Sequence, residues 1–83
     1  MKTYKSHVEL NGKQSPSTGC CTAYYGKSPW KNLKVAYMFF ELSDCSGKVR
    51  LHNSQLDTKE QFISKLKKLD KELKDFIEFL ERA

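Results

Sequence analysis

The chain has 83 residues, of which 39% are hydrophobic and 30% are charged, and these proportions indicate one small globular domain over 1–83 and exclude a disordered chain. Fifteen Lys and Arg residues against ten Asp and Glu residues give a formal net charge of +5, which suits an anionic partner but is common in proteins without one. The longest apolar run, 35–40, is far shorter than the ~20 residues of a membrane span, and the N-terminus lacks the apolar core of a signal peptide, so we expect a cytoplasmic protein with no membrane segment.

The first predicted element is a half-buried strand over residues 3–10. Tyr4, Val8 and Leu10 alternate there with polar residues, the period of two that places one set of side chains on one face. The Asn-Gly pair that follows is typical of a tight hairpin. The polar residues and breakers after that pair nevertheless predict a longer loop over about 11–19.

Three more strands are predicted before the helix. Residues 20–26 have strand-like composition and are followed by a loop that carries Trp30. Residues 33–42 form the central strand, with apolar side chains on both faces, and a turn follows over 43–47. Residues 48–52 alternate cleanly between polar and apolar. Four consecutive strands and then one helix predict the α+β class, with an antiparallel four-stranded sheet and one helix across a face.

The last predicted element is a long amphipathic helix over 58–82. Its large apolar residues are spaced alternately four and three apart, which places them on one stripe: Phe62, Leu66, Leu69, Leu73, Phe76 and Leu80. Thr58 and Gln61 have the spacing of a capping box. The helix would be about 37 Å long, whereas a strand of about eight residues covers about 27 Å. Because the helix outruns the sheet, we expect a homodimer in which a second subunit shields Leu73, Phe76 and Leu80.

The sequence carries no signature of an enzyme. It lacks a G-x-S-x-G motif, a Gly-rich phosphate loop and an H-E-x-x-H motif. The cysteines, Cys20, Cys21 and Cys45, lack the paired spacing of a zinc site, so we expect no metal, no cofactor and three reduced thiols. Two alternatives stay open: a zinc site of three cysteines and one histidine, and a cysteine nucleophile with His7 or His52 as its base.

Basic residues interleaved with aromatic ones form the remaining candidate site. Lys48, Arg50 and His52 share one side of a strand, in a row about 14 Å long that consecutive phosphates could follow. Further candidates are Lys34 for phosphates and Tyr24, Tyr25, Tyr37 and Trp30 for base stacking. In the rival interpretation, the basic row is only the polar outer side of a strand whose Val49 and Leu51 pack beneath the helix.

The layout as a whole resembles a known fold. Strands over 3–10, 20–26, 33–42 and 48–52, followed by a helix that opens at Thr58, resemble the single-strand-binding fold of the positive-cofactor-four and Pur families. This resemblance implies a curved sheet, a dimer and binding of single-stranded nucleic acid, and it carries over no functional residue. The layout is also similar to that of small phage-encoded inhibitors, including some anti-CRISPR proteins.

We therefore expect a small non-enzymatic protein that binds single-stranded DNA or RNA through a basic and aromatic sheet face. The alternative is a phage or mobile-element inhibitor that binds a host protein through an interface centred on Trp30, Phe39 and Phe40. Salt separates the two, because nucleic-acid binding weakens steeply as salt rises and a largely apolar protein interface does not.

Overall fold

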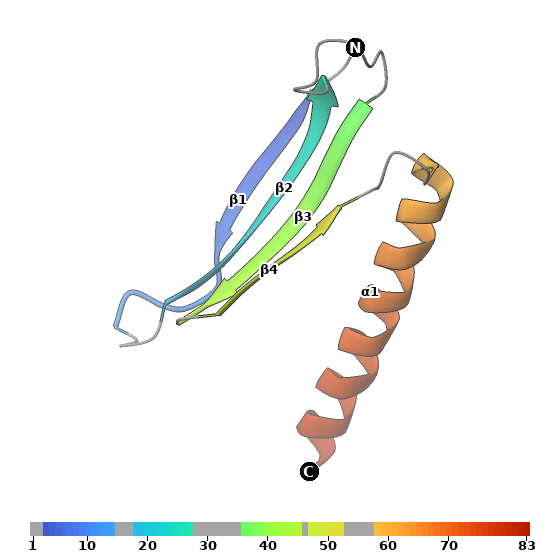
Figure 1. The fold of residues 1–83 in the computed structure, drawn as a ribbon. Coiled ribbons are helices and arrows are strands. Elements are labelled where there is room, and N and C mark those ends of the chain that lie inside the picture. The colour runs from blue at the N-terminus through green and yellow to red at the C-terminus, as the bar shows by residue number, and fades with distance from the viewer. Residues whose placement is uncertain (1–2, 15–17, 28–35, 46, 53–57) are drawn as a thin grey trace. The chain divides into compact units, whose positions relative to one another are not determined.

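The computed structural model describes residues 3–14, 18–27, 36–45, 47–52 and 58–83. The chain forms four antiparallel strands and one C-terminal helix, which confirms the predicted α+β layout (Figure 1). The elements are β1 (Tyr4–Glu9), β2 (Gly19–Lys27), β3 (Ala36–Asp44), β4 (Gly47–His52) and α1 (Lys59–Arg82). The predicted start of the central strand, 33–35, lies outside the described residues. Contacts divide the chain into two compact units, Met1–His52 and Asn53–Ala83, and the expectation of a single domain stays a prediction.

The sheet is a meander in which each strand pairs with its neighbours in sequence, in the order β1-β2-β3-β4. Because successive residues of a strand point to opposite faces, the register sorts the side chains into two sets. The apolar face carries Tyr4, Ser6 and Val8 of β1, Cys21, Ala23 and Tyr25 of β2, Met38, Phe40 and Leu42 of β3, and Val49 and Leu51 of β4. The polar face carries Lys5, His7 and Glu9 of β1, Cys20, Thr22 and Tyr24 of β2, Tyr37, Phe39, Glu41 and Ser43 of β3, and Lys48, Arg50 and His52 of β4.

Few hydrophobic side chains of the described residues are buried. Met38 of β3, in the first unit, is 6% exposed, and Phe62 of α1, in the second unit, is 5% exposed. The other apolar residues of β2 and β3 are half-buried. At the two edges of the sheet, Val8 of β1 and Val49 of β4 are exposed. Small domains bury a low share of their surface, so the free energy of unfolding is expected to be low.

The connection between β1 and β2 is longer than a tight hairpin, as the polar residues after Asn11-Gly12 predict. β1 ends at Glu9 and β2 begins at Gly19, while the described residues of the connection form no strand. The backbone N–H of Leu10 donates a hydrogen bond to the carbonyl of Gly19 at 2.8 Å, so pairing continues one residue beyond β1.

The connection between β3 and β4 is tighter than the turn predicted over 43–47. β3 continues through Asp44, which pairs with Gly47. Cys45 then turns the chain with a φ of 51°, in the left-handed region that few non-glycine residues adopt. Its backbone N–H donates to the carbonyl of Thr18 at 2.7 Å, which ties this turn to the start of β2. The polar composition of the segment predicted where the chain reverses, but not how far strand pairing extends into it.

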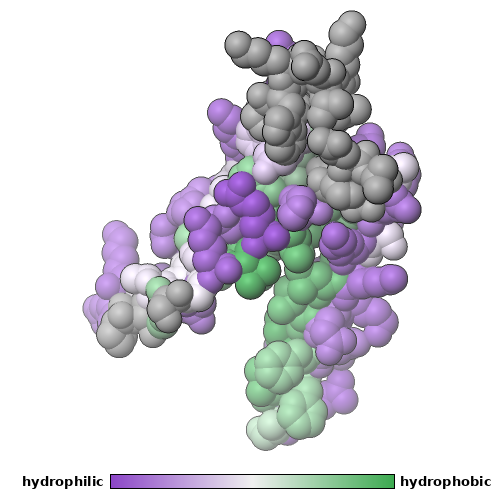
Figure 2. Space-filling model, viewed as in Figure 1, coloured by the Kyte–Doolittle hydropathy of each residue, from purple (hydrophilic) through white to green (hydrophobic). Residues whose placement is uncertain are grey.

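The helix begins with the predicted capping box, which is confirmed. The backbone N–H of Gln61 donates to Thr58 Oγ1 at 3.1 Å, and the backbone N–H of Thr58 donates to Gln61 Oε1 at 2.7 Å. The 24 residues of α1 span about 36 Å. Apolar side chains form a strip along one side of α1, with hydrophilic ones along another (Figure 2). Ion pairs four residues apart link Asp70 to Lys74, Lys71 to Asp75, and Glu78 to Arg82.

Candidate nucleic-acid interface

The polar face of the sheet brings together most of the predicted binding residues. Lys48, Arg50 and His52 of β4 lie on it with Tyr24 of β2 and Tyr37 of β3. Across the strands, Tyr24 pairs with Phe39, and Phe39 pairs with His52. The residues that sequence patterns placed at separate points of the chain therefore share one surface.

Three of the predicted residues are not on this surface as described. Tyr25 belongs to the apolar face, where it pairs with Tyr4 and Met38, so it does not share a surface with Tyr24. Adjacent residues of one strand point in opposite directions, and Tyr24 and Tyr25 cannot both face the same ligand while β2 stays regular. Lys34 and Trp30 lie outside the described residues.

Three aromatic rings form a cluster on the polar face. Tyr24 stacks on Phe39, with ring centroids 5.6 Å apart and an interplanar angle of 15°. Tyr37 packs at a tilt against both rings, at 6.1 Å from Tyr24 and 5.8 Å from Phe39. Such centroid distances are typical of favourable aromatic pairs. All three residues are half-buried, so part of each remains open to solvent.

Gly26 makes room for the Tyr24 ring. A Cβ atom at Gly26 would lie 2.6 Å from Tyr24 Oη and 2.9 Å from Cζ, closer than Cβ atoms come to non-bonded atoms in folded proteins. The hydroxyl of Tyr24 in turn donates to the carbonyl of Lys27 at 3.5 Å. Because Gly26 has no side chain, the Tyr24 ring can pack directly over the backbone of β2, beside Phe39.

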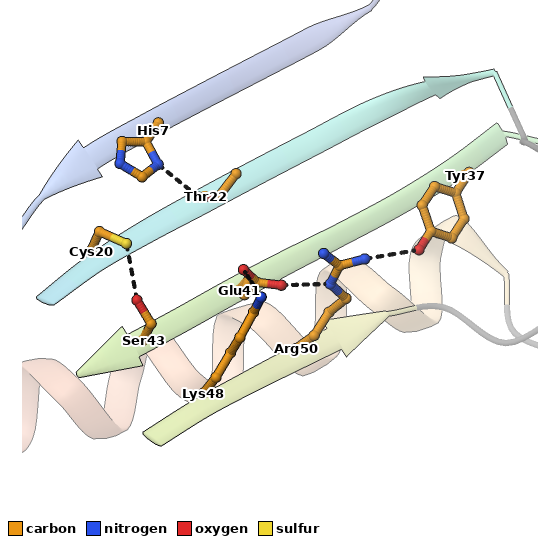
Figure 3. A network of polar contacts seen from close by, with 8 residues as sticks. All are labelled: His7, Cys20, Thr22, Tyr37, Glu41, Ser43, Lys48 and Arg50. Carbon is orange, nitrogen blue, oxygen red and sulfur yellow. Dashed lines mark hydrogen bonds and ion pairs between the residues drawn. The ribbon is translucent and has the colours of Figure 1, made fainter. Parts of the chain in front are cut away.

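Arg50 connects the aromatic cluster to a carboxylate (Figure 3). Its Cζ lies 4.0 Å from the centroid of the Phe39 ring, within the range of a cation–π contact. Its Nε donates to Glu41 Oε2 at 2.7 Å, and its Nη1 donates to the Tyr37 hydroxyl at 3.5 Å. Stacked on one residue and hydrogen-bonded to two others, the Arg50 guanidinium is held in a defined position.

Glu41 partly neutralises the predicted basic row. Besides Arg50, its carboxylate contacts Lys48, with 3.4 Å between Lys48 Nζ and Glu41 Oε1. The Glu41 side chain is 14% exposed, whereas those of Lys48 and Arg50 are 64% and 44% exposed. One shielded carboxylate thus holds two outward-facing cations.

The ionisation of this group follows from the contacts. The hydrogen bond from Arg50 lowers the pKa of Glu41 below its ordinary value, with smaller contributions from Lys48, while partial desolvation opposes the shift. The hydrogen bond to Glu41 raises the pKa of Arg50, and the bond to Tyr37 acts in the same direction. Both groups are therefore charged at neutral pH, and the pair is an ion pair.

A second set of polar contacts on the polar face links β1 to β2 and β2 to β3 (Figure 3). His7 Nδ1 lies 2.9 Å from Thr22 Oγ1, and His7 Nε2 lies 2.9 Å from Glu9 Oε1. Cys20 Sγ lies 3.0 Å from Ser43 Oγ. Three basic residues, Lys5, Lys48 and Arg50, stand against two acidic ones, Glu9 and Glu41, so with neutral histidines the described polar face carries a net charge of 3 − 2 = +1.

Sequence reasoning missed the roles of Glu41 and Phe39 at this site. Alternation along the strand already predicts that Phe39 and Glu41 lie on the same face as Tyr37. Their contacts with Arg50, however, depend on the register that sets Glu41 opposite Arg50, and alternation within one strand does not contain that information.

The predicted dimer residues lie on the exposed part of α1. Leu73, Phe76 and Leu80 are 48%, 57% and 54% exposed. Near the end of the helix, Phe79 and Arg82 are among the residues that line a shallow open hollow of about 360 Å³. The hollow lies to one side of the predicted stripe.

The described residues contain no helix that is long and apolar enough to cross a membrane. Within the same ranges, no group of three or more His, Cys, Asp or Glu side chains is placed to hold a metal ion. Cys20, Cys21 and Cys45 carry free thiols. Comparison of the chain with protein-family models, curated proteins and solved structures found no match in any of the three.

Proposed function

We propose that the polar face of the sheet binds single-stranded DNA or RNA, without enzymatic activity. The observation that carries the proposal is the position of the Tyr24, Tyr37 and Phe39 cluster directly beside Arg50. Aromatic rings next to exposed cations on a sheet are what an unpaired strand requires, since its bases stack on rings and its phosphates contact Lys and Arg.

The rings have different roles in this proposal. Arg50 lies over Phe39, so Phe39 supports the cation and its neighbours rather than receiving a base. Tyr24 and Tyr37 are the half-buried rings on which bases stack. Stacking contributes about 1–3 kcal/mol per base and is largely independent of sequence. A duplex keeps its bases stacked inside, which is why the proposal names single strands.

The phosphate contribution is expected to be modest. Glu41 already pairs with Lys48 and Arg50, so incoming phosphates compete with a carboxylate for both cations. For single strands, the logarithm of the binding constant falls with the logarithm of salt concentration by about 0.7 per phosphate contacted. A face that engages one or two phosphates should therefore show a slope of about −0.7 to −1.4.

Fluorescence anisotropy with a labelled strand of ~20 nucleotides, at low and at moderate salt, tests the proposal. The paired change Lys48→Glu with Arg50→Glu should abolish binding while the circular dichroism spectrum stays that of the wild type. The matched control is Lys67→Glu with Lys68→Glu, which alters net charge equally on α1, outside the sheet. Lys48→Gln with Arg50→Gln serves if the glutamates disturb the sheet beside Glu41. Absence of wild-type binding even at low salt would refute the proposal.

A second change tests the aromatic part separately. Tyr37→Leu should weaken binding at every salt concentration and leave the salt slope unchanged, because a stacking surface is lost and no charge is. Tyr4→Leu is the control, since Tyr4 is 60% exposed on the apolar face. Equal effects of the two substitutions would remove Tyr37 from the site.

The pairing of Lys48 and Arg50 with Glu41 is also an observation that favours the second candidate function, binding of a host protein by a phage-type inhibitor. A face of low net charge presents rings and hydrogen-bonding groups as protein interfaces do. The same anisotropy series decides between the two: the host-protein function predicts no binding of the labelled strand at either salt concentration.

Assembly and location belong to the same proposal. We place the protein in the cytoplasm, as a homodimer in which the α1 stripe of one copy covers Leu73, Phe76 and Leu80 of the other. Leu73→Glu should dissociate this dimer, because burying an unpaired carboxylate costs several kcal/mol. Sedimentation equilibrium that gives 9.7 kDa for the wild type at about 100 μM would contradict the dimer.

A further inference from the structure

β1 is an edge strand that pairs on one side with β2. We propose that its other side pairs with β1 of a second copy of this chain. The two strands run antiparallel and are related by a two-fold axis that passes beside His7. The two four-stranded sheets then form one continuous sheet. The inference rests on the backbone and the charges of β1 and does not depend on nucleic-acid binding.

The backbone of β1 fixes which residues face outward. Leu10 donates its N–H to Gly19 of β2, so the backbone groups of Leu10 point inward, to β2. In antiparallel sheets this direction alternates along the strand. The N–H and C=O groups of Lys5, His7 and Glu9 therefore point away from β2, and no further strand pairs with them in the described part of the chain. A second copy can pair with these groups only if its own outward residues stand opposite.

Centring the pair on His7 meets that condition and matches the charges. His7 then faces His7 of the second copy, and Lys5 faces Glu9 of the second copy, twice by symmetry. Opposite charges directly across two strands stabilise a sheet, and like charges destabilise it. Sliding the register by two residues in either direction removes both Lys–Glu pairs, and sliding it by one sets outward residues against inward ones.

The apolar face of β1 is complementary to itself in the same register. Tyr4 stands opposite Leu10 of the second copy, and Ser6 stands opposite Val8. Tyr4, Leu10 and Val8 are 60%, 55% and 48% exposed in the single chain, so pairing covers large side chains that are otherwise open. In this one register the outward backbone groups can form hydrogen bonds, the opposite charges face each other, and the exposed apolar side chains cover each other.

The central histidines leave space for each other. The ring of His7 is held toward β2 of its own chain by Thr22, at 2.9 Å. Its other nitrogen contacts Oε1 of Glu9, at 2.9 Å, which leaves Oε2 of that carboxylate for Lys5 of the second copy. The observed contacts of His7 and Glu9 are therefore compatible with the pair.

The opposite edge of the sheet does not share this property. The polar side of β4 carries Lys48, Arg50 and His52, and no acidic residue. An antiparallel copy of β4 centred on Arg50 would set Arg50 against Arg50. Cationic edges resist pairing, and many proteins use them for that purpose. The sheet thus has one edge that repels its copy and one that matches it.

A two-fold axis normal to the sheet keeps the polar faces of both copies on the same side. Pairing along one strand buries less area than a standard interface, so the dimer should be reversible, with a dissociation constant of roughly micromolar order. It uses no residue of α1. A chain with both interfaces would assemble beyond a dimer.

Sedimentation velocity on the full chain from 5 to 500 μM, a span of about two decades around the expected constant, provides the test. Lys5→Glu alone and Glu9→Lys alone each set like charges opposite and should raise the dissociation constant by about tenfold or more. The double variant should return it to within about threefold of the wild type. Lys13→Glu, outside β1, is the charge-matched control and should leave it unchanged.

Mixing the two single variants gives the decisive result. A Lys5→Glu chain and a Glu9→Lys chain face each other with two attractive pairs, so the mixture should form heterodimers through β1 more tightly than either variant pairs with itself through β1. Contacts through α1 are the same in all these samples and cannot produce this pattern. A wild type that stays monomeric at 500 μM, single variants that pair like the wild type, or a mixture that fails to associate would each overturn the proposal.

Discussion

Replacing Glu41 with glutamine changes the charge of the polar face while nearly keeping its shape. The carboxylate lies 2.7 Å from Arg50 Nε and 3.4 Å from Lys48 Nζ, and glutamine keeps nearly the same volume without the negative charge. The net charge of the described polar face rises from +1 to +2, and both cations become free to contact phosphate. We therefore expect Glu41→Gln to bind a single strand more tightly than the wild type.

The salt dependence gives the expected size of the effect. The wild type already engages one or two phosphates, so freeing Lys48 and Arg50 from Glu41 should add about one contact and make the salt slope steeper by about 0.7. Between 50 and 200 mM salt, typical assay limits and about a fourfold change, the variant should lose about 2.6 times more affinity than the wild type loses. Anisotropy titrations at four or more salt concentrations measure this directly.

Glu9→Gln is the matched control for that experiment. It raises the charge of the face by the same amount, but Glu9 contacts His7 and releases neither cation of β4. A salt slope that is unchanged in Glu41→Gln, or that steepens equally in both variants, would show that Glu41 does not restrain Lys48 and Arg50.

Three further predictions follow from local contacts. Gly26→Ala should displace the Tyr24 ring and weaken strand binding and the near-ultraviolet circular dichroism of the cluster, whereas Gly12→Ala, with no atom within 4 Å, should change neither. Thr58→Ala should lower the free energy of unfolding by about 1 kcal/mol in a denaturant titration, and Thr58→Ser should not. Folding lowers the pKa of Glu41 below its ordinary value of 4.5, so ionised Glu41 stabilises the fold at pH values above 4.5. This stabilisation is lost as the pH falls below 4.5. The melting temperature of the wild type should therefore fall more steeply than that of Glu41→Gln between about pH 5 and 3.

The elements that sequence patterns predicted well are those with local causes. Strand alternation around Val8 and Val49, and the capping pair Thr58 and Gln61, involve residues within a few positions of each other. The structure confirms the antiparallel sheet, the C-terminal helix and the capping box. The register places Tyr24 and Tyr37 on the same face as Arg50, and Tyr25 on the other face.

The features that sequence patterns did not predict depend on register and on strand ends. To predict that Glu41 pairs with Arg50, the register between β3 and β4 has to be known, because a shift of one residue would move the carboxylate to the other face. Tyr25 was grouped with Tyr24 by composition, yet alternation separates them. The continuation of β3 through Asp44 depends on the backbone of Cys45 at positive φ, a conformation for which cysteine gives no signal.

The order of the strands has a consequence for how the sheet folds. Every strand pairs with the one before or after it in the chain, so no pairing in the sheet has to close a long loop. The entropy lost on closing a loop grows with its length, and short closures speed folding. The β3–β4 hairpin has the shortest connection, with Asp44 opposite Gly47, and is expected to form first. Strand β2, paired on both sides, joins that hairpin to β1, so pulse-labelling hydrogen exchange during refolding should find the β1 amides the last of the sheet to gain protection.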